Sequence, residues 1–373
     1  MTTKSIIPLF IFGVGNVGST LIKQISERFA TSLPQSQNQL RIVFIANSKK
    51  SVFNIDGVDF QEIQNLSASG NNYDVASVIA LVDAHQFQNP ILIDVTASET
   101  FVSKYVDFIR AGFHIVAANK KANTLPIFDY QHLKKELQLH NRQFLYETNV
   151  GAGLPIIQTL SDLKLAKEKV TKIRGVFSGS LSYIFNQLGQ NHRAFSEILN
   201  EAEHLGLTEP DAREDLSGQD VARKLLILAR ELGHPFDFSD VKITSLLVPE
   251  LSLSVPFQTF QQQKNLLDQP FEIAKKAQRE NHVLRYVGEF DVLSKTLEAK
   301  LVSVPKSTPL GQLTGTSNFF EITTAFYSEN PIIIQGPGAG KEVTALGVLS
   351  DVLKISRKVA ASKINFCETS IAS

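Results

Sequence analysis

The 373-residue sequence has one cysteine, one methionine and no tryptophan, and it has no net charge. The 37 lysines and arginines match 37 aspartates and glutamates, so no excess of positive charge is available to bind DNA, RNA or an anionic membrane. The single cysteine, Cys367, excludes a disulfide framework and any Cys-based zinc or iron–sulfur site. The expected partner is therefore a small molecule or a second copy of the chain.

Long apolar runs and a leader segment are also missing. No segment approaches the ~18 uninterrupted apolar residues of a membrane span, and a long apolar run, residues 6–14, has only the length of a strand. Residues 1–5 lead directly into that run without the basic and apolar regions of a signal peptide. We therefore expect a cytoplasmic protein that does not span a membrane. The length predicts roughly two globular domains.

Motifs of zinc enzymes and serine hydrolases are missing as well. The eight histidines form no close H-x-x-H or H-E-x-x-H pair, and no G-x-S-x-G segment occurs. His204 and His234 are therefore expected at helix ends or on the surface, not as metal ligands.

The first 150 residues alternate short apolar runs with helical patterns. Expected helices cover residues 17–29, 101–110 and 126–139, and expected strands cover residues 9–12, 42–46, 91–95, 114–118 and 144–146. This alternation predicts a parallel sheet covered on both faces, as in an α/β Rossmann-type domain over residues 1–150.

The pattern changes after Val150. Helical runs at residues 181–189, 195–205 and 220–232 precede strand patterns at residues 282–292, 297–304, 319–327 and 331–334. Consecutive strands predict an antiparallel or mixed sheet, so residues 151–335 are expected to form a second, α+β domain. Residues 336–373 contain a glycine-rich turn and a helical pattern over residues 343–359, which we expect to complete the first domain.

A glycine motif follows the first expected strand and opens the first helix. Its sequence is Phe12-Gly13-Val14-Gly15-Asn16-Val17-Gly18, which matches G-x-G-x-x-G. In such a motif the glycines allow a tight turn, close approach of a pyrophosphate and close packing of the helix, whose N-terminus binds the anion. The context predicts a dinucleotide site, with an ordinary glycine-containing turn as the alternative.

The end of the second strand bears on the choice of dinucleotide. NAD sites usually carry an acidic residue here, which binds the ribose 2′-OH, but this chain has Ala46-Asn47-Ser48-Lys49-Lys50. The missing carboxylate and the two lysines favour a 2′-phosphate, and hence NADP. A solvated basic turn would have the same residues, so both interpretations stay open.

Residues 206–224 form the most concentrated polar segment. Asp220 and Lys224 are four residues apart on an expected helix, so they can pair on one face, and Leu225 and Leu228 turn that side toward a core or cleft. A partly desolvated lysine beside a carboxylate could donate or accept a proton. A structural interpretation fits the same spacing, because Ser217-x-x-Asp220 resembles a capping box.

Six motifs, in order along the chain, resemble those of the homoserine dehydrogenase family. The second-domain signature, Gly-x-x-Glu-Pro-Asp followed by Asp-Leu-x-Gly-x-Asp-Val-Ala-Arg-Lys-Leu, occupies residues 206–225. The form of residues 177–186 resembles the short, monofunctional, fungal-type enzymes in particular. The other matches lie at residues 13–18, 118–122, 146–155 and 336–345.

The resemblance implies the reversible NAD(P)H-dependent reduction of L-aspartate 4-semialdehyde to L-homoserine, a step toward threonine and methionine. It implies that Lys224 is the general acid, that Asp220 orients it or the substrate hydroxyl, and that Lys120 is a second catalytic or binding lysine. The implied substrate-binding residues are Glu209, Asp215, Gly179 and Ser180. The implied cofactor-binding residues are Gly13, Gly15, Asn16, Val17, Gly18, Lys49, Thr96, Lys120, Gly206 and Gly340.

The resemblance further implies a homodimer joined through the second domain. It also implies a monovalent-cation site for Na⁺ or K⁺, formed by the carboxylate of Glu147 and the backbone carbonyls of Val150, Ala152 and Leu154. The sequence contains neither an aspartokinase domain nor an ACT regulatory domain, so feedback control through an appended threonine site is not expected.

Some residues depart from the family pattern. Ser178 and Ser180 replace an Asn and a Thr, and Ser180 keeps the hydroxyl. Leu207 stands where relatives often have an aromatic residue, so the shape of the substrate loop stays open. Lys341-Glu342 replaces an acidic or amide pair after the last glycine.

Two other functions remain as alternatives. Another two-domain NAD(P)-dependent amino-acid dehydrogenase would share residues 13–18, but would not require Asp215, Asp220 and Lys224 together. A non-catalytic nucleotide sensor would have lost the chemistry, and the presence of Lys120 and Glu209 beside that pair argues against it.

Overall fold

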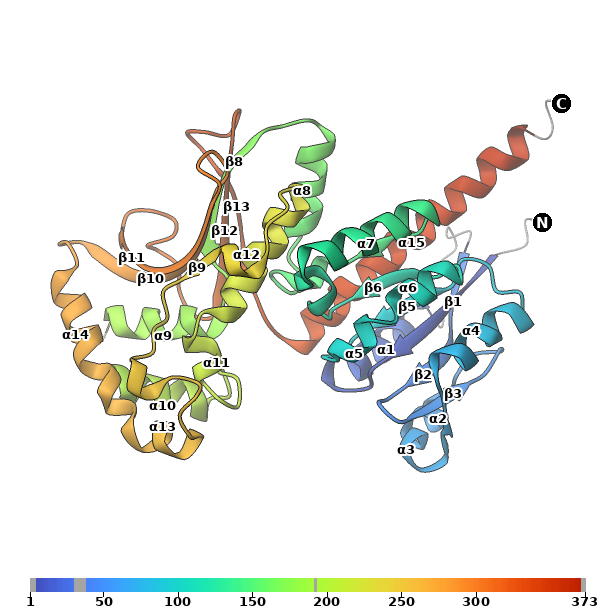
Figure 1. The fold of residues 1–373 in the computed structure, drawn as a ribbon, viewed down its shortest axis with the longest axis horizontal. Coiled ribbons are helices and arrows are strands. Elements are labelled where there is room, and N and C mark those ends of the chain that lie inside the picture. Colours follow the sequence, from blue (N-terminus) through green and yellow to red (C-terminus); the bar gives the residue numbers. More distant parts are fainter. Residues whose placement is uncertain (1–4, 30–37, 191–192, 370–373) are drawn as a thin grey trace. The chain divides into compact units, whose positions relative to one another are not determined.

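The computed structural model describes residues 5–29, 38–190 and 193–369. The chain divides into two compact units, one formed by Met1–Asn149 with Gly340–Ser373 and the other by Val150–Ala339. Each unit contains one sheet and is described separately (Figure 1). The expectation about a leader rests partly on residues 1–4, and the one about disulfides and Cys-based metal sites rests on Cys367. Residues 1–4 and the side chain of Cys367 lie outside the described part.

The sheet of the first unit has seven strands in the order β4-β3-β2-β1-β5-β6-β7. Strands β2, β1, β5, β6 and β7 are parallel, whereas β3 and β4 form an antiparallel extension beyond β2. The parallel part confirms the expected strands, but β3 and β4 were not expected because they are short and polar. The strands are β1 (Ser5–Phe12), β2 (Asn38–Ala46), β3 (Lys50–Phe53), β4 (Asn71–Asn72), β5 (Ile91–Asp94), β6 (His114–Ala117) and β7 (Phe144–Leu145).

Helices surround this sheet. The helix expected over residues 101–110 is interrupted at Ser103 and Lys104 and forms α5 and α6. The last helix is longer than expected, because no proline or glycine follows Gly347 to end it. The helices are α1 (Asn16–Phe29), α2 (Phe60–Gln64), α3 (Leu66–Ser69), α4 (Val75–Ala84), α5 (Glu99–Val102), α6 (Tyr105–Arg110), α7 (Ile127–Leu139) and α15 (Lys341–Thr369), with the 3₁₀ turns η1 (Lys121–Thr124) and η2 (Glu147–Asn149).

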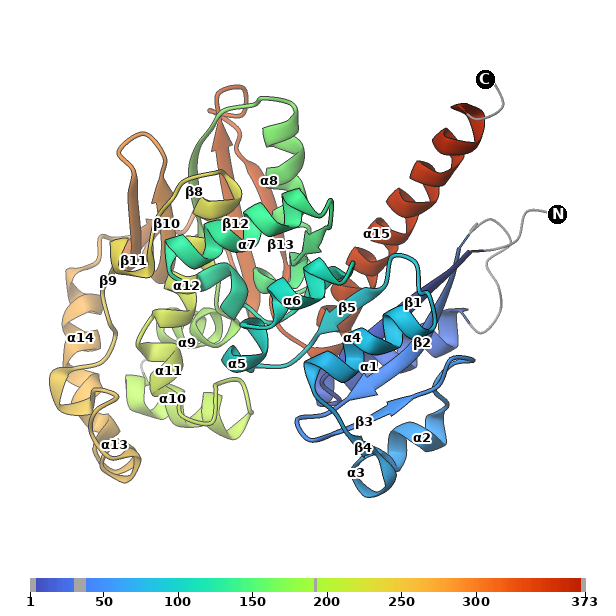
Figure 2. The same cartoon turned by 45° about the vertical axis from the view of Figure 1, so that its right-hand side comes forward.

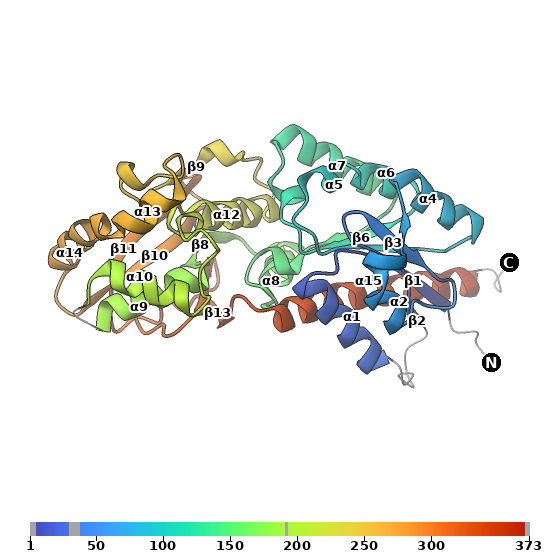
Figure 3. The ribbon, with the colours of Figure 1, turned by 90° about the horizontal axis from the view of Figure 1, so that it is seen from below.

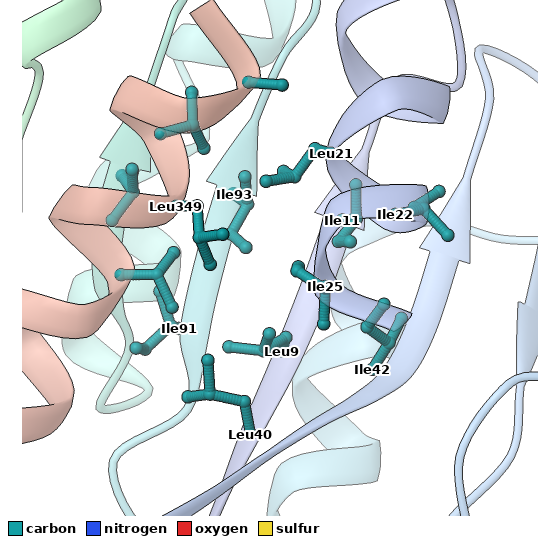
Figure 4. Close-up of a cluster of buried hydrophobic side chains, with 14 of the residues drawn as sticks. Leu9, Ile11, Leu21, Ile22, Ile25, Leu40, Ile42, Ile91, Ile93 and Leu349 are labelled. Carbon is teal, nitrogen blue, oxygen red and sulfur yellow. The ribbon is translucent and has the colours of Figure 1, made fainter. Parts of the chain in front are cut away.

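Strand β1 divides the core of the first unit into two clusters. Leu9 and Ile11 point toward α1 and α15, where Leu21, Ile25 and Leu349 complete an aliphatic cluster (Figure 4). The last helix thus packs beside α1 on the same face of the sheet (Figure 3). On the opposite face, Phe10 and Phe12 lie among the rings of Phe44, Phe101, Phe108 and Phe113. Both faces are covered, as a buried parallel sheet requires.

The sheet of the second unit has six strands in the order β13-β12-β8-β10-β11-β9. Neighbours are antiparallel except β9 and β11, so the expected mixed sheet is confirmed. Strand β8 lies in the middle but was not expected, because Lys172 and Arg174 interrupt its apolar pattern. The strands are β8 (Val170–Val176), β9 (Val241–Ile243), β10 (His282–Asp291), β11 (Thr296–Pro305), β12 (Ser317–Thr324) and β13 (Ile332–Pro337).

Two long helices, α9 and α12, pack against this sheet (Figure 2). His204 ends α10 and His234 follows α12, as expected for helix-end residues. The helices are α8 (Ile156–Leu165), α9 (Gly179–Gln190), α10 (Phe195–His204), α11 (Arg213–Leu216), α12 (Gln219–Glu231), α13 (Phe257–Gln263) and α14 (Asp268–Ala277), with the 3₁₀ turns η3 (Phe238–Asp240), η4 (Pro249–Leu251) and η5 (Lys264–Leu267). Within the described residues, no helix of either unit has the length and apolar character needed to cross a membrane.

Candidate active site

The glycine motif forms the turn between β1 and α1 in the first unit. Gly13 has a φ of +106°, and a Cβ atom there would lie 2.9 Å from the carbonyl oxygen of Val95. A Cβ atom on Gly18 would overlap the carbonyl oxygen of Gly13, so only glycine lets α1 approach the strand this closely. Beside Gly15 the space is open, and the first turn of α1 carries no acidic residue. The exposed helix N-terminus therefore fits the pyrophosphate of a dinucleotide.

Lys49 lies in the turn between β2 and β3, next to the glycine motif. The N–H of Gly13 donates to the carbonyl of Ala46, 2.8 Å away, which joins the two turns. The side chain of Asn47 accepts hydrogen bonds from the N–H groups of Lys49 and Lys50, at 2.8 and 2.7 Å. Asn47 therefore shapes the turn, and the exposed side chain of Lys49 lies at its tip. This position is compatible with a phosphate ligand and with a solvated turn.

Two loops of the first unit are joined by the buried carboxylate of Asp94, at the end of β5. It accepts hydrogen bonds from the N–H of Thr96 at 2.8 Å, the hydroxyl of Tyr105 at 2.7 Å and the side-chain amide of Asn119 at 3.0 Å. Asn119 also donates to the carbonyl of Ser98, 2.9 Å away. Burial raises the pKa of Asp94, while these donors oppose the rise. The arrangement fixes the loop that carries Thr96.

Lys120 follows Asn119 directly and precedes η1. Its side chain is half-buried, and its carbonyl accepts the N–H of Asn123 at 3.1 Å. Because Asn119 is tied to Asp94, the hydrogen bonds of Asp94 position both Lys120 and Thr96 at the carboxyl ends of parallel strands. That edge is where ligands bind in open α/β sheets. These roles of Asp94 and Asn119 were not predicted from the sequence, although an aspartate at the end of an apolar strand is a detectable signal.

Glu147 is buried in η2 of the first unit. Its N–H donates to Asp351 at 2.9 Å, and the ammonium of Lys354 lies 3.5 Å from its carboxylate. Burial raises the pKa of Asp351, although the positive charge of Lys354 acts to lower it. The described residues contain no group of three or more His, Cys, Asp or Glu that could hold a metal ion. One carboxylate with backbone carbonyls would not form such a group. Lys354 also pairs with Asp351 at 2.9 Å, so Glu147 shares its positive charge with a second carboxylate.

The other members of the expected cation set belong to the second unit. Val150 and Ala152 are buried, Ala152 has a φ of +52°, and the N–H of Leu154 donates to Gly151 at 3.0 Å. The expected cation site stays a prediction, because its residues are divided between the units. Gly340, with a φ of +125°, is exposed immediately before α15 in the first unit.

Lys224 is one of several buried cationic residues of the second unit. Its ammonium lies 2.7 Å from the carboxylate of Asp220 and 2.6 Å from the carbonyl oxygen of Phe177. The capping-box interpretation of residues 217–220 is wrong, because Gly218, in the left-handed conformation, is the N-cap of α12, and the Ser217 hydroxyl accepts the N–H of Gln219 at 3.3 Å. Asp220 pairs with Lys224 instead, so the i,i+4 spacing places the pair at the end of α12 nearest the turn between β8 and α9.

A carboxylate lies beside the same turn. Asp215 accepts a hydrogen bond from the hydroxyl of Ser180 at 2.5 Å and from the N–H of Glu209 at 2.8 Å. The hydroxyls of Ser178 and Ser180 are 2.8 Å apart. Burial raises the pKa of Asp215, and the negative charges of Glu209 and Asp220 raise it further. Asp215 thus connects the start of α9 with the loop that carries Glu209.

Arg213 holds that loop in place. Its guanidinium bonds Asp211 through two nitrogens, at 2.9 and 2.6 Å, and donates to the carbonyls of Ser252 and Val255 at 3.1 and 2.6 Å. This role of Arg213 was not predicted from the sequence either. The loop begins at Gly206, which has a φ of +67° and lies two residues beyond the end of α10.

The second unit therefore brings together most of the residues expected there. Hydrogen bonds, ion pairs or direct succession along the chain link six of these residues: Gly179, Ser180, Glu209, Asp215, Asp220 and Lys224. A buried ammonium beside several carboxylates can move a proton and can bind a small substrate that carries an amino group. In the first unit, the open helix N-terminus can hold a dinucleotide.

Two family sequence profiles match the chain. The profile described as "Homoserine dehydrogenase" matches residues 155–353, and the profile described as "Homoserine dehydrogenase, NAD binding domain" matches residues 13–147. A chloroplastic bifunctional aspartokinase/homoserine dehydrogenase of Zea mays is 38% identical over 363 residues, which are 96% of this chain and 39% of that protein. The chain spans about two fifths of the length of the curated relatives it matches.

Solved structures share the fold. A Candida auris protein described as of unknown function is 33% identical, with a TM-score of 0.86 over 94% of this chain and 98% of that chain. A hyperthermophilic archaeal homoserine dehydrogenase in complex with NADPH is 22% identical, with a TM-score of 0.71 over 95% of this chain and 98% of that chain. The predicted two-domain α/β architecture is confirmed.

Proposed function

Because the chain belongs to the homoserine dehydrogenase family, we propose that it catalyses the reversible NAD(P)H-dependent reduction of L-aspartate 4-semialdehyde to L-homoserine, in the formation of threonine and methionine. The observation that carries the proposal is the position of Lys224. Its buried ammonium is held between Asp220 and the carbonyl of Phe177, beside the carboxylate-rich loop of residues 206–215. We therefore take this ammonium as the proton donor to the aldehyde oxygen.

The first unit holds the cofactor. The N-terminus of α1, with Asn16 and Val17, takes the pyrophosphate beside Gly15, and Thr96, Lys120 and Gly340 complete the pocket. When bound, a nicotinamide cofactor supplies the hydride that reduces the aldehyde carbon. Lys49, at the tip of the neighbouring turn, contacts the 2′-phosphate, so NADP is the expected cofactor. The solved archaeal relative contains NADPH.

The second unit binds the amino acid. Glu209 and Asp215 take the substrate ammonium, and Gly179 and Ser180 line the turn where its backbone atoms lie. Gly206, at the start of the loop after α10, is included among the cofactor-binding residues of the proposal. These contacts orient the aldehyde, and orientation is the main requirement of hydride transfer.

The position of Lys224 suits it to transfer the proton. Its ammonium donates a proton to the aldehyde oxygen in the reducing direction, and the neutral amine accepts the hydroxyl proton of homoserine in the reverse direction. Asp220 orients the ammonium and balances its charge. General acid catalysis of this kind contributes about 10²–10⁴-fold. Lys120 acts as a second catalytic or binding lysine.

The proposal includes a monovalent cation, Na⁺ or K⁺, held by Glu147, Val150, Ala152 and Leu154. It also includes a homodimer formed through the second unit. The sheet face opposite α12 carries the linked charges of Glu289, Lys172 and Lys300, at 3.0 Å each from the glutamate, and the exposed Ile333. The partner is a small molecule and not a nucleic acid or a membrane, and the expected location is cytoplasmic.

The test is an absorbance assay at 340 nm with aspartate 4-semialdehyde and either NADPH or NADH. We expect oxidation of NADPH, and homoserine-dependent reduction of NADP⁺ in reverse. The variant Lys224→Ala should lose about 10²-fold or more of kcat while still binding NADPH. Another amino-acid dehydrogenase would turn over a different substrate, and a nucleotide sensor would bind the cofactor without turnover, so absence of activity with both cofactors would remove the assignment.

A matched control removes another lysine that also has a partner four residues away on a helix. Lys23 pairs with Glu27 at 3.7 Å, and both side chains are mostly exposed. Exposed pairs of this kind contribute little. Lys23→Ala should therefore keep wild-type turnover, and an equal loss in both variants would mean that the Lys224 effect is not catalytic.

A further inference from the structure

The carbonyl oxygen that receives Lys224 also receives a second donor. The side-chain amide of Asn318, in β12, donates to the carbonyl of Phe177 at 3.2 Å, and the ammonium of Lys224 donates to it at 2.6 Å. A carbonyl oxygen has two lone pairs. Asn318 therefore occupies one acceptor position and leaves the other for the lysine. Asn318 is completely buried, so its amide is not exchanging partners with bulk water.

Phe177 itself is held firmly. Its ring fills a slot between two neighbouring strands, where a Cβ atom on Gly175 would lie 2.8 Å from the ring and one on Gly288 would lie 2.5 Å from it. On another side the ring stacks on Phe320, with centroids 4.8 Å apart. The ring accounts for the glycine at position 288, whereas a Cβ atom at position 175 would also overlap the carbonyl oxygen of Phe319. The packing restrains the backbone of Phe177, but a carbonyl direction also depends on its hydrogen bonds.

Asn318 is held from its other side by the glycine-rich segment before α15. A Cβ atom on Gly338 would overlap the amide group of Asn318, which explains why the chain has a glycine there. The amide oxygen Oδ1 has no hydrogen-bond partner in the described residues. A buried acceptor without a partner is costly. Within the described residues, the hydrogen bond that the side-chain amide makes is therefore the one that its NH₂ group donates to Phe177.

We propose that Asn318 is a positioning residue for Lys224, acting through the carbonyl of Phe177; the inference rests on the proposed function of Lys224. An ammonium has three donors. Asp220 and the Phe177 carbonyl take two of them, so the direction of the third is determined by where those two acceptors lie. Asn318 fixes one of the acceptors, and the third N–H is thereby aimed at the substrate oxygen.

The test compares kcat, KM and cofactor affinity of Asn318→Ala with wild type. Loss of the amide lets the Phe177 carbonyl turn, so kcat should fall about tenfold, the effect expected when one buried hydrogen bond at a reacting group is lost. The Kd for NADPH should stay within about twofold. Gly338→Ala should also lower kcat, because its methyl group displaces Asn318. In the Asn318→Ala background, Gly338→Ala should add little, since the group it displaces is gone.

Asn186 provides a matched control. It is a buried asparagine of the same unit, and its amide also donates to a backbone carbonyl, that of Gly315 at 3.0 Å. Asn186→Ala should cost stability like Asn318→Ala but leave kcat near the wild-type value. Equal kcat losses in the two alanine variants, wild-type kcat in Asn318→Ala, or additive effects of Gly338→Ala would each overturn the proposal.

A second readout does not depend on turnover. The rate at which an amine-acylating reagent labels Lys224, followed by peptide mass spectrometry, reports how firmly the ammonium is held. Labelling should be about tenfold faster in Asn318→Ala and unchanged in Asn186→Ala. If wild-type protein has no homoserine dehydrogenase activity, the proposed function fails, and unchanged labelling would separately show that Asn318 does not position the lysine.

Discussion

The variant Asp94→Asn tests whether the buried hydrogen bonds at the end of β5 prepare the first unit for a cofactor. Asp94 accepts three hydrogen bonds, from Thr96, Tyr105 and Asn119. An asparagine of the same shape has one acceptor atom and one donor atom. The Tyr105 hydroxyl can turn to accept from the new amide, but the amide of Asn119 cannot do so without losing its bond to Ser98. The substitution therefore leaves one buried donor facing another donor.

The magnitude follows from that conflict. One unsatisfied buried polar group costs about 1–3 kcal/mol, and part of this is offset because a neutral amide is easier to bury than the carboxylate whose pKa burial raises. A net cost of about 1.4 kcal/mol corresponds to about tenfold in an equilibrium constant. The cost falls on the loops of Thr96 and Lys120, so we expect the Kd for NADPH to rise about tenfold in a fluorescence titration.

Tyr105→Phe is the control, because it removes one donor to Asp94 and leaves both loop-tethering bonds in place. It should lower stability by about 1 kcal/mol with less than about a twofold change in Kd. Wild-type affinity in Asp94→Asn, or the same affinity loss in Tyr105→Phe, would refute the proposed role of the Asp94 hydrogen bonds.

The pKa of Asp94 also determines in which direction the stability of the protein changes with pH. Since burial raises the pKa of Asp94 in the folded protein, the folded state binds a proton at a higher pH than the unfolded chain does. The contribution of this group to stability therefore falls as pH rises through its folded-state pKa. Asp94→Asn has no such group, so the stability advantage of wild type in urea unfolding should widen as pH falls toward that pKa.

Two further predictions concern the turn of Lys49 and the loop held by Arg213. Lys49→Ala should raise KM for NADPH about tenfold with no change for NADH, as steady-state assays with both cofactors would show; equal effects would favour the solvated-turn interpretation. Arg213→Leu should destabilise the second unit by about 2–4 kcal/mol, less than a fully buried pair because Asp211 is partly exposed, and should raise KM for the semialdehyde but not for NADPH. Because Arg213 lowers the pKa of Asp211, the difference in stability between wild type and Arg213→Leu should shrink as the pH falls through that lowered pKa. An unchanged KM for the semialdehyde would show that Arg213 does not position the loop.

Most regular elements were predictable where the apolar pattern is local. Strands β1, β2, β5 and β6 have uninterrupted apolar runs, and α9, α10 and α12 have an apolar face with helical spacing, so short stretches of sequence were enough. Strand β8 escaped detection because its outward face carries Lys172 and Arg174. The β3–β4 pair escaped it because a two-residue strand has no periodicity.

The site residues also divide into those that local sequence predicts and those that it does not. The Asp220–Lys224 pair was predictable because four residues on a helix determine the distance, and the tertiary structure then rejected the capping-box alternative by placing Gly218 at the N-cap. Asp94, Asn119 and Arg213 were missed since each acts through partners from other loops. The cation site and the cofactor preference stay predictions, because carbonyl ligands leave no side-chain signature and Lys49 lies on an exposed turn.

The sequence by itself determined the features whose cause lies within a few neighbouring residues: the glycine turn, where the oxygen of Gly13 excludes a side chain on Gly18, the alternation of strands and helices, and the ordered motifs of the family. Only the tertiary structure decided which distant groups share an atom. Phe177, Lys224 and Asn318 meet at one carbonyl because β8 lies between β12 and β10, and α12 packs on that sheet. Strand order places residues far apart in the chain side by side, and no local pattern encodes it.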